Sequence, residues 1–122
     1  MRLFSLIAAL GFTLLASSGF ATTLNTSMVD VPGGQIVGCE AVNVSKKPLS
    51  VTISVTDFDG TVIFSPGVET ASPGGGAFAT ITLSGEKHAY CSFLFSGSAK
   101  SVRGSIEVFD LTTGASVALP AS

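Results

Sequence analysis

Apolar and polar residues alternate with a period of two along much of this chain, a spacing that matches a half-buried β-strand. In SVTISVT (residues 50–56), Val51, Ile53 and Val55 fall on one face and hydroxyl side chains fall on the other. FATITL and VRGSIEVFD alternate in the same way, and QIVGCEAVNV and ASVALP are further strand candidates. No window beyond residue 21 keeps a helical period, so the sequence predicts an all-β fold.

Turn-forming residues separate these segments at short intervals. DVPGG, SKKP, DFDG, SPGGG, SGEK, SGSAK and TTG place glycine, proline or small polar residues between candidate strands. A short strand is expected at Thr61–Phe64, directly after DFDG. About seven short strands, turned every ~8–12 residues, predict an antiparallel β-sandwich that forms a single domain over residues 22–122.

The first residues have the layout of a secretory signal peptide. Arg2 precedes an apolar run from Leu3 to Ala16, and Gly19 and Ala21 then occupy the small-residue positions of a cleavage site. The run is shorter than the roughly 20 residues that a membrane-spanning helix needs. We therefore expect residues 1–21 to be a cleaved leader, and the mature protein to be periplasmic or extracellular and to have no membrane span.

Two cysteines, Cys39 and Cys91, are expected to form a disulfide, because an exported chain reaches an oxidising compartment. The bridge closes a loop of about 50 residues and should stabilise the fold by about 4 kcal/mol on the chain-entropy model. For a small domain this is a large share of the total stability.

The segments around the cysteines resemble an immunoglobulin-like domain. GCEAVNVS is similar to its strand B and YCSFLF to its strand F, and the resemblance covers Gln35 to Asp110. It implies a sandwich whose two sheets are pinned together by the disulfide. The chain has no tryptophan for strand C, and Tyr90 stands directly before Cys91 instead of two residues before it. The segment order also resembles small exported bacterial proteins of unknown function, which implies no activity.

The segment DFDGTV predicts a turn or, as an alternative, a weak calcium site. Asp57, Asp59 and Gly60 are similar to the opening of a calcium loop, which needs several oxygen ligands. The third ligand before the glycine and the closing glutamate of such a loop are missing. Asp-Gly between two alternating segments is a strong hairpin signal, so a turn is the first expectation. One histidine and a disulfide do not supply a zinc site, and no cofactor is expected.

Catalytic patterns are sparse in the chain. His88 is the one histidine, and the alternation places it on the opposite strand face from Cys91, so no Cys–His dyad is expected. No G-x-S-x-G motif is present to indicate a serine hydrolase. A small carboxylate-based hydrolase stays as an alternative, and it requires two carboxylates within about 10 Å in one pocket. We expect a protein that is not an enzyme.

One predicted surface suits an interface with another protein. If the strands that contain His88 and Arg103 are neighbours in one sheet, their outer faces form a single patch of aromatic and charged residues, which often anchor interfaces. The patch consists of His88, Tyr90, Arg103, Glu107 and Phe109. Two alternatives stay open: a terminal segment covers this face, or its apolar residues are scattered surface without a function.

The charge balance bears on the class of partner, and two sequence motifs bear on glycosylation. Without Arg2, five Lys and Arg residues stand against eight Asp and Glu residues, a mild balance that favours neither nucleic acid nor membrane as a partner. Asn25 and Asn43 begin glycosylation sequons, and Asn25 is expected to be the more accessible of the two. We expect a binding or structural component of the cell envelope or extracellular space, with another protein there as its partner.

Overall fold

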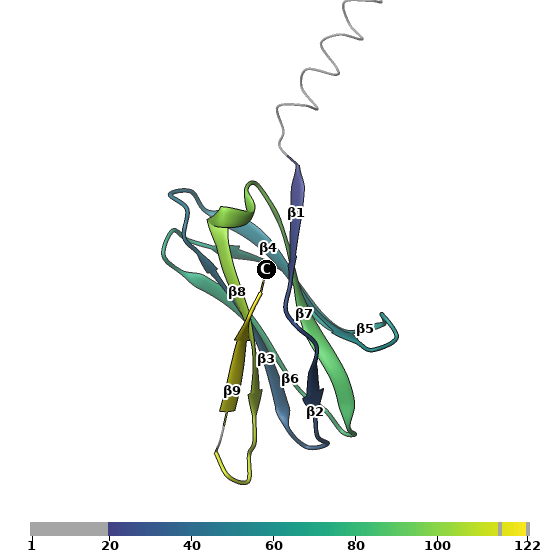
Figure 1. The fold of residues 1–122 in the computed structure, drawn as a ribbon. Helices are drawn as coiled ribbons and strands as arrows, with labels where there is room; N and C mark the ends of the chain where they lie inside the picture. The colour runs from purple at the N-terminus through teal and green to yellow at the C-terminus, as the bar shows by residue number, and fades with distance from the viewer. Residues whose placement is uncertain (1–19, 115, 122) are drawn as a thin grey trace, which may run out of the picture.

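The computed structural model describes residues 20–114 and 116–121, so nearly all of the predicted leader lies outside the described residues (Figure 1). In this part of the chain nine strands and one short 3-10 helix, η1 (Ala99–Ser101), follow one another. The strands are β1 (Ala21–Asn25), β2 (Val29–Val31), β3 (Ile36–Asn43), β4 (Leu49–Asp57), β5 (Val62–Ala71), β6 (Gly76–Thr82), β7 (Lys87–Ser96), β8 (Val102–Phe109) and β9 (Ser116–Pro120). Among the described residues, no helix is long and apolar enough to cross a membrane.

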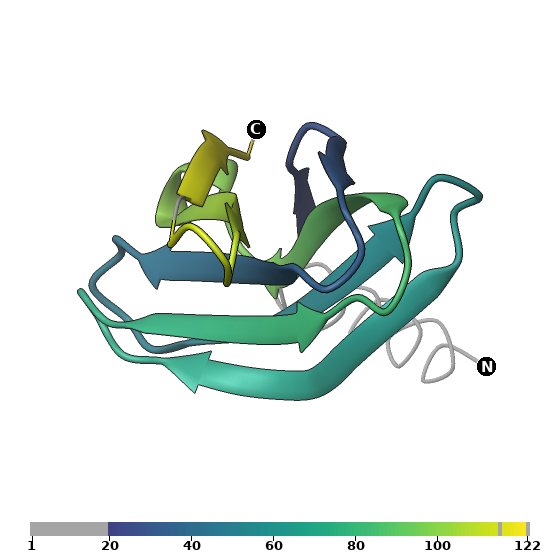
Figure 2. The same ribbon diagram turned by 90° about the horizontal axis from the view of Figure 1, so that it is seen from below.

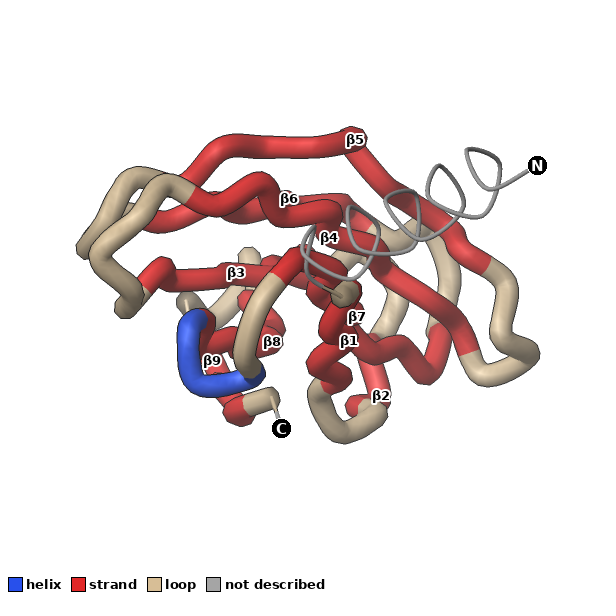
Figure 3. The backbone as a smooth tube through the Cα atoms, turned by 90° about the horizontal axis from the view of Figure 1, so that it is seen from above, coloured by secondary structure: helices blue, strands red, loops and turns tan. Residues whose placement is uncertain are grey.

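The strands form two antiparallel sheets. One, here called the β7 sheet, has the order β1-β7-β4-β5, with β2 also paired to β7. The other, here called the β3 sheet, has the order β6-β3-β8-β9. Two views from opposite sides show β5 and β6 along one side of the molecule and β1, β2 and β9 along the other (Figures 2 and 3). The protein is therefore an all-β sandwich, as the alternation predicts.

The core lies between the sheets and is built from the inward positions of the alternating segments. In β4 the three predicted inward residues, Val51, Ile53 and Val55, are completely buried. In β7 every second residue from Ala89 to Phe95 is buried, and Phe93 is the largest completely buried side chain in the described range. Burying one such apolar side chain stabilises the fold by about 1.5–3 kcal/mol. The period-two pattern thus defines the core as well as the strands.

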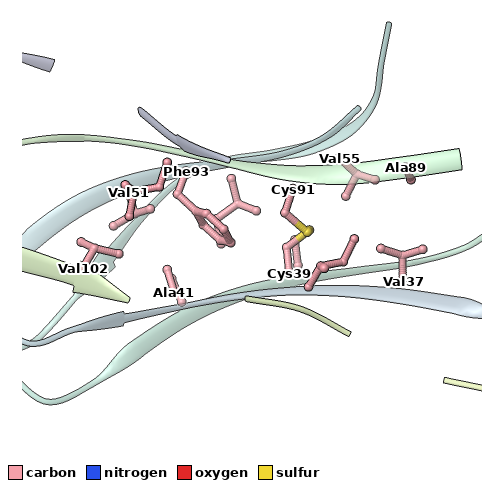
Figure 4. Close-up of a cluster of buried hydrophobic side chains, with 14 of the residues drawn as sticks. Val37, Cys39, Ala41, Val51, Val55, Ala89, Cys91, Phe93 and Val102 are labelled. Atoms are coloured by element: carbon pink, nitrogen blue, oxygen red, sulfur yellow. A yellow bond between two sulfur atoms is a disulfide. The ribbon is translucent and has the colours of Figure 1, made fainter. Parts of the chain in front are cut away.

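The disulfide connects the two sheets through this core. Cys39 lies in β3 and Cys91 in β7, both are completely buried, and their Cα atoms are 5.8 Å apart (Figure 4). Each strand has partners on both of its edges. The bridge therefore ties together the interiors of two sheets, and the predicted pairing is confirmed.

The strand after DFDG extends further than the sequence indicates. We expected it to end at Phe64, but β5 continues to Ala71. It is an edge strand, where Pro66 is tolerated because no neighbouring strand needs the missing N–H. Irregular register between β4 and β5 bends the strand around the position of the proline. The Pro-Gly pair therefore sits inside the strand.

Strand β8 does not lie beside β7, as the predicted interface patch requires. Both edges of β7 are already occupied, one by β4 and the other by β1 and β2. The segment that contains η1 (blue in Figure 3) leads the chain to the other sheet, where β8 pairs with β3. The condition for the single patch, that the strands of His88 and Arg103 are neighbours, is therefore not met. The order also differs from the immunoglobulin arrangement, in which the strand after the second cysteine pairs with that cysteine's strand.

Candidate functional site

The outer faces of the two sheets have different chemistry. On the β7 sheet the outward positions of β4 carry hydroxyl groups, and one cross-strand pair on this face is Ser54 with Ser92. On the β3 sheet the outward positions include Phe78 and Phe109, and the side chain of Phe78 is 63% exposed. A solvated sheet face normally alternates polar residues outward. Apolar side chains are also exposed on the outer face of the β7 sheet, where Val68 and Leu94 flank Thr52. The β3 sheet is distinguished by its outward phenylalanines.

A shallow depression of about 260 Å³ lies in the middle of this face. It is lined by Gly38, Cys39, Glu40, Phe78, Thr80, Glu107 and Phe109. The register explains its shape. Phe78 of β6 stands opposite Glu40, Gly38 stands between Thr80 and Glu107, and Phe109 of β8 stands opposite Ile36. The two phenylalanines thus flank the central row, in which β3 has no side chain.

Gly38 is buried and forms a floor without a side chain in the depression, although the fold does not require glycine there. Its φ is not positive, and an added Cβ atom would lie 3.6 Å from Thr80 Cγ2 and 3.7 Å from Phe109 Cε2, which are ordinary van der Waals distances. Gly104 on the inner face is different, because an added Cβ atom there would lie 2.5 Å from Phe93 Cε2. Glycine inside a strand weakens it and often marks a close approach of a ligand or another chain. The absent side chain at position 38 therefore costs stability without a need in the fold.

Two carboxylates that form no ion pair with a described residue border the depression. Glu40 is exposed and Glu107 is half-buried, and neither forms an ion pair with any described residue. The one salt-bridge contact among residues 20–114 and 116–121 joins His88 Nδ1 to Asp30 Oδ1 at 3.9 Å, on the other sheet, and it is an ion pair only when His88 is protonated. Arg103 is on the β3 sheet but pairs with Val42, one outward row beyond Glu40. The rim of the depression is therefore negatively charged.

The predicted interface residues divide between the two sheets. His88 and Tyr90 lie on the outer face of β7, whereas Glu107 and Phe109 line the depression on the β3 sheet. Arg103 shares the outer face of the β3 sheet but does not line the depression. The single patch does not form, because β7 and β8 belong to different sheets. Its β8 half is the half that lies beside a concave surface.

Sequence reasoning missed Gly38, Glu40, Phe78 and Thr80 as lining residues. The alternation in FATITL contains a signal for them, because it places Phe78 on the same outward face as Thr80 and Thr82. A phenylalanine at the end of a threonine face is unusual for a solvated surface. Gly38 inside an apolar strand is a second signal. Phe78 and Gly38 lie near each other only because β3 pairs with β6, and the local sequence pattern does not contain this pairing.

Asp57 uses its carboxylate to shape the DFDG turn. Asp57 Oδ1 accepts hydrogen bonds from the backbone N–H groups of Asp59 at 2.9 Å and Thr61 at 3.0 Å. The backbone carbonyl of Asp57 accepts from the N–H of Gly60, whose φ is +82°. The predicted turn is confirmed. Across the described ranges, no three or more His, Cys, Asp or Glu side chains gather closely enough to hold a metal ion.

Two other hollows have linings that suit a binding site less well than the depression on the β3 sheet does. One of about 300 Å³ opens between β2 and the β8–β9 end and is lined by Val29, Asp30, Gln35, Val108, Asp110 and Val117. The other, of about 200 Å³, lies beside the DFDG turn and is lined by Asp57, Phe58, Asp59, Glu86, Lys87 and His88. The first faces the edge of the core, and the second mixes opposite charges. Neither combines aromatic walls with a floor that carries no side chain.

The two sequons differ in accessibility. The Asn43 side chain is 1% exposed, and its Nδ2 donates to the carbonyls of Lys47 at 2.7 Å and Ala71 at 2.9 Å. Its Oδ1 accepts from the backbone N–H of Ser45 at 2.9 Å. Asn25 is exposed at the end of β1. Asn43 is therefore a structural residue of the fold, and Asn25 is the accessible acceptor.

Comparisons with known proteins give no family for this chain. No family model matches the chain, and no curated protein matches it either. Among solved structures, the crystal structure of Thermotoga maritima 1070 is similar with a TM-score of 0.46 and 10% identity, over 82% of this chain and 91% of that one. A chain of infectious bursal disease virus Gt strain is similar with a TM-score of 0.43 and 18% identity, over 84% of this chain and 26% of the viral chain.

Proposed function

We propose that this protein is an exported, non-enzymatic β-sandwich that binds another protein of the cell envelope or extracellular space through the depression on the β3 sheet. The observation that carries the proposal is the combination at the depression of exposed Phe78, a floor at Gly38 that carries no side chain and a rim of unpaired carboxylates. Aromatic residues at the centre of a concave patch with polar groups around it are typical of interface anchors.

Two observations support the export part of the proposal. The predicted leader over residues 1–21 directs a chain to the periplasm or the extracellular space. The buried Cys39–Cys91 bridge suits an oxidising compartment, because disulfides are rare in reducing ones. We further propose an immunoglobulin-like relationship for the sandwich, since its cysteine strands lie in opposite sheets, with β8 displaced from the usual order.

A pull-down compares the two outer faces directly. The oxidised mature protein is immobilised and exposed to native envelope extract or culture medium, and the retained proteins are identified by mass spectrometry. The variant Phe78→Thr with Phe109→Thr should lose the specifically retained protein. The control variant Tyr90→Thr with Leu94→Thr changes the outer face of β7 and should retain it. Equal retention by the first variant and the unchanged protein would exclude the depression as the binding surface.

A carboxylate hydrolase is a second candidate, because Glu40 and Glu107 line the same depression. Glycosidases use a carboxylate pair on either side of the scissile bond. Glu40 is exposed, whereas a general acid is usually held in a site that raises its pKa by burial. We therefore favour binding over catalysis. Hydrolysis of a glycoside panel that disappears in Glu40→Gln and Glu107→Gln would reverse this preference.

A further inference from the structure

We propose that the depression receives the side chain of an arginine or lysine that projects from the partner polypeptide. This inference rests on the proposed binding function and adds the chemistry of the group that is bound. The depression offers three features to such a group: aromatic rings on two sides, carboxylates on the rim and a floor of backbone. Each feature constrains the ligand in a different way.

The aromatic rings attract a cation and the aliphatic stem that carries it. The negative face of a phenylalanine ring draws an ammonium or guanidinium group that lies within about 6 Å of the ring centre. Arginine and lysine also have long aliphatic stems that pack on apolar surface while the charged head stays hydrated. Phe78 and Phe109 stand on opposite sides of Gly38 in the sheet register. A side chain that enters between them can contact both rings.

The carboxylates decide the sign of the ligand's charge. Glu40 lies beside Phe78 in the register, and Glu107 lies beside Gly38. An anionic ligand would meet both carboxylates, and a neutral apolar ligand would remove water from them without replacing it. A guanidinium group instead offers several N–H donors that suit carboxylate oxygens. Arg103, one row further along the face, is the cation nearest to Glu40 in the register, and it forms no ion pair with a described residue.

The floor at Gly38 sets the depth of entry. Gly38 is buried, and an added Cβ atom there would lie 3.6 Å from Thr80 Cγ2 and 3.7 Å from Phe109 Cε2, so an entering side chain packs on these two neighbours above a floor that carries no side chain. The Glu107 carbonyl lies 3.9 Å from the same place, so backbone atoms border the floor. The surrounding face continues with Ile36, Val42 and Pro120 at outward positions. A partner polypeptide can therefore contact the rest of the face while one cationic side chain fills the depression.

A matched pair of small probes tests the inference. Capped arginine (N-acetyl-arginine N-methylamide) and capped citrulline have nearly the same shape, but only arginine is charged. The isotopically labelled, oxidised protein is titrated with each probe to tens of millimolar, and amide shifts are followed by NMR. Capped arginine should shift the amides of Gly38, Glu40, Phe78, Thr80 and Glu107, with a dissociation constant on the order of millimolar. Capped citrulline should bind at least about fivefold more weakly, since it loses the charge-assisted contacts.

Two variants test the charge and the floor of the depression, and a third is a control. Glu40→Gln with Glu107→Gln keeps the shape and should remove most of the preference for capped arginine over capped citrulline, leaving the part that comes from the aromatic rings. Gly38→Ala adds a methyl group to the floor without a clash. It should weaken the binding of capped arginine about threefold or more, because the methyl group occupies part of the depression. Glu86→Gln removes an exposed carboxylate at a different hollow and should leave the titration unchanged.

The outcomes separate this inference from the proposed function. Preference for arginine that is mostly lost in the double glutamine variant supports the inference. Equal shifts by both probes at the depression overturn the cationic ligand, while the binding surface itself stands. No shift at the depression with either probe also overturns the inference. The proposed function is then decided by the pull-down with Phe78→Thr and Phe109→Thr, which does not depend on the probe.

Discussion

Two glycines of the β3 sheet should respond in opposite directions to the same substitution. Gly104 faces the core, and an added Cβ atom would lie 2.5, 2.7 and 3.1 Å from three ring carbons of Phe93. Gly38 faces outward, where an added Cβ atom would make ordinary contacts at 3.6 Å and beyond. The comparison uses one chemical change, glycine to alanine, in neighbouring strands of one sheet.

The magnitudes follow from packing and from chain entropy. Phe93 is completely buried, so its ring cannot move aside without displacing the core around it. Overpacking of this kind costs about 1–3 kcal/mol, and Gly104→Ala should lower the free energy of unfolding by that amount. Gly38→Ala should raise the free energy of unfolding by about 0.5–1 kcal/mol, because alanine loses less backbone freedom on folding into a strand.

Urea unfolding of the oxidised proteins, followed by far-ultraviolet circular dichroism, measures both changes, since the chain has no tryptophan to report by fluorescence. The slopes of the unfolding curves should match that of the unchanged protein, so that the midpoints report stability alone. A Gly104→Ala protein within ~0.5 kcal/mol of the unchanged one would show that Phe93 does not pack against position 104 as described. A Gly38→Ala protein destabilised by more than ~1 kcal/mol would show that the fold needs this glycine, and would refute the reasoning about the floor of the depression.

Three further predictions concern stability and metal binding. Cys39→Ala with Cys91→Ala should lower the free energy of unfolding by about 4 kcal/mol in urea, and a loss below ~1 kcal/mol would contradict a structural role of the bridge. Asn43→Ala should cost about 2–3 kcal/mol in the same assay, because it leaves the buried Ala71 carbonyl without the donor it now has, and an unchanged midpoint would contradict this. Calcium at millimolar concentration should leave the melting temperature unchanged, because the Asp57 carboxylate already accepts two backbone N–H groups, and a rise that Asp59→Asn removes would support the calcium alternative.

The sequence pattern predicts the strands and the core better than it predicts their order. Alternation depends on which face of a strand is buried, and it places Val51, Ile53 and Phe93 in the core correctly. It contains no information on which strand lies beside which. The position of β8 depends on β1 and β2 occupying the free edge of β7, and these two short strands carry weak patterns of their own.

The candidate site depends on this missing information. Phe109 and Glu107 are outward residues of one strand, as the alternation predicts, but their neighbours lie on β3 and not on the strand of His88. Gly38 and Phe78 belong to strands far from β8 in sequence, and the depression exists only where the three strands meet. The local pattern predicts which face of its strand each residue occupies. Which of these strands lie side by side is seen only in the tertiary structure.

The central claim is that the outer face of the β3 sheet, and not that of the β7 sheet, meets the partner. NMR mapping of the labelled protein in complex with the partner recovered from native extract tests it most directly. The account predicts that the largest amide and side-chain shifts fall on β3, β6 and β8 around Gly38 and Phe78. Shifts concentrated on β4 and β7 around Tyr90, with the β3 sheet unchanged, would contradict it.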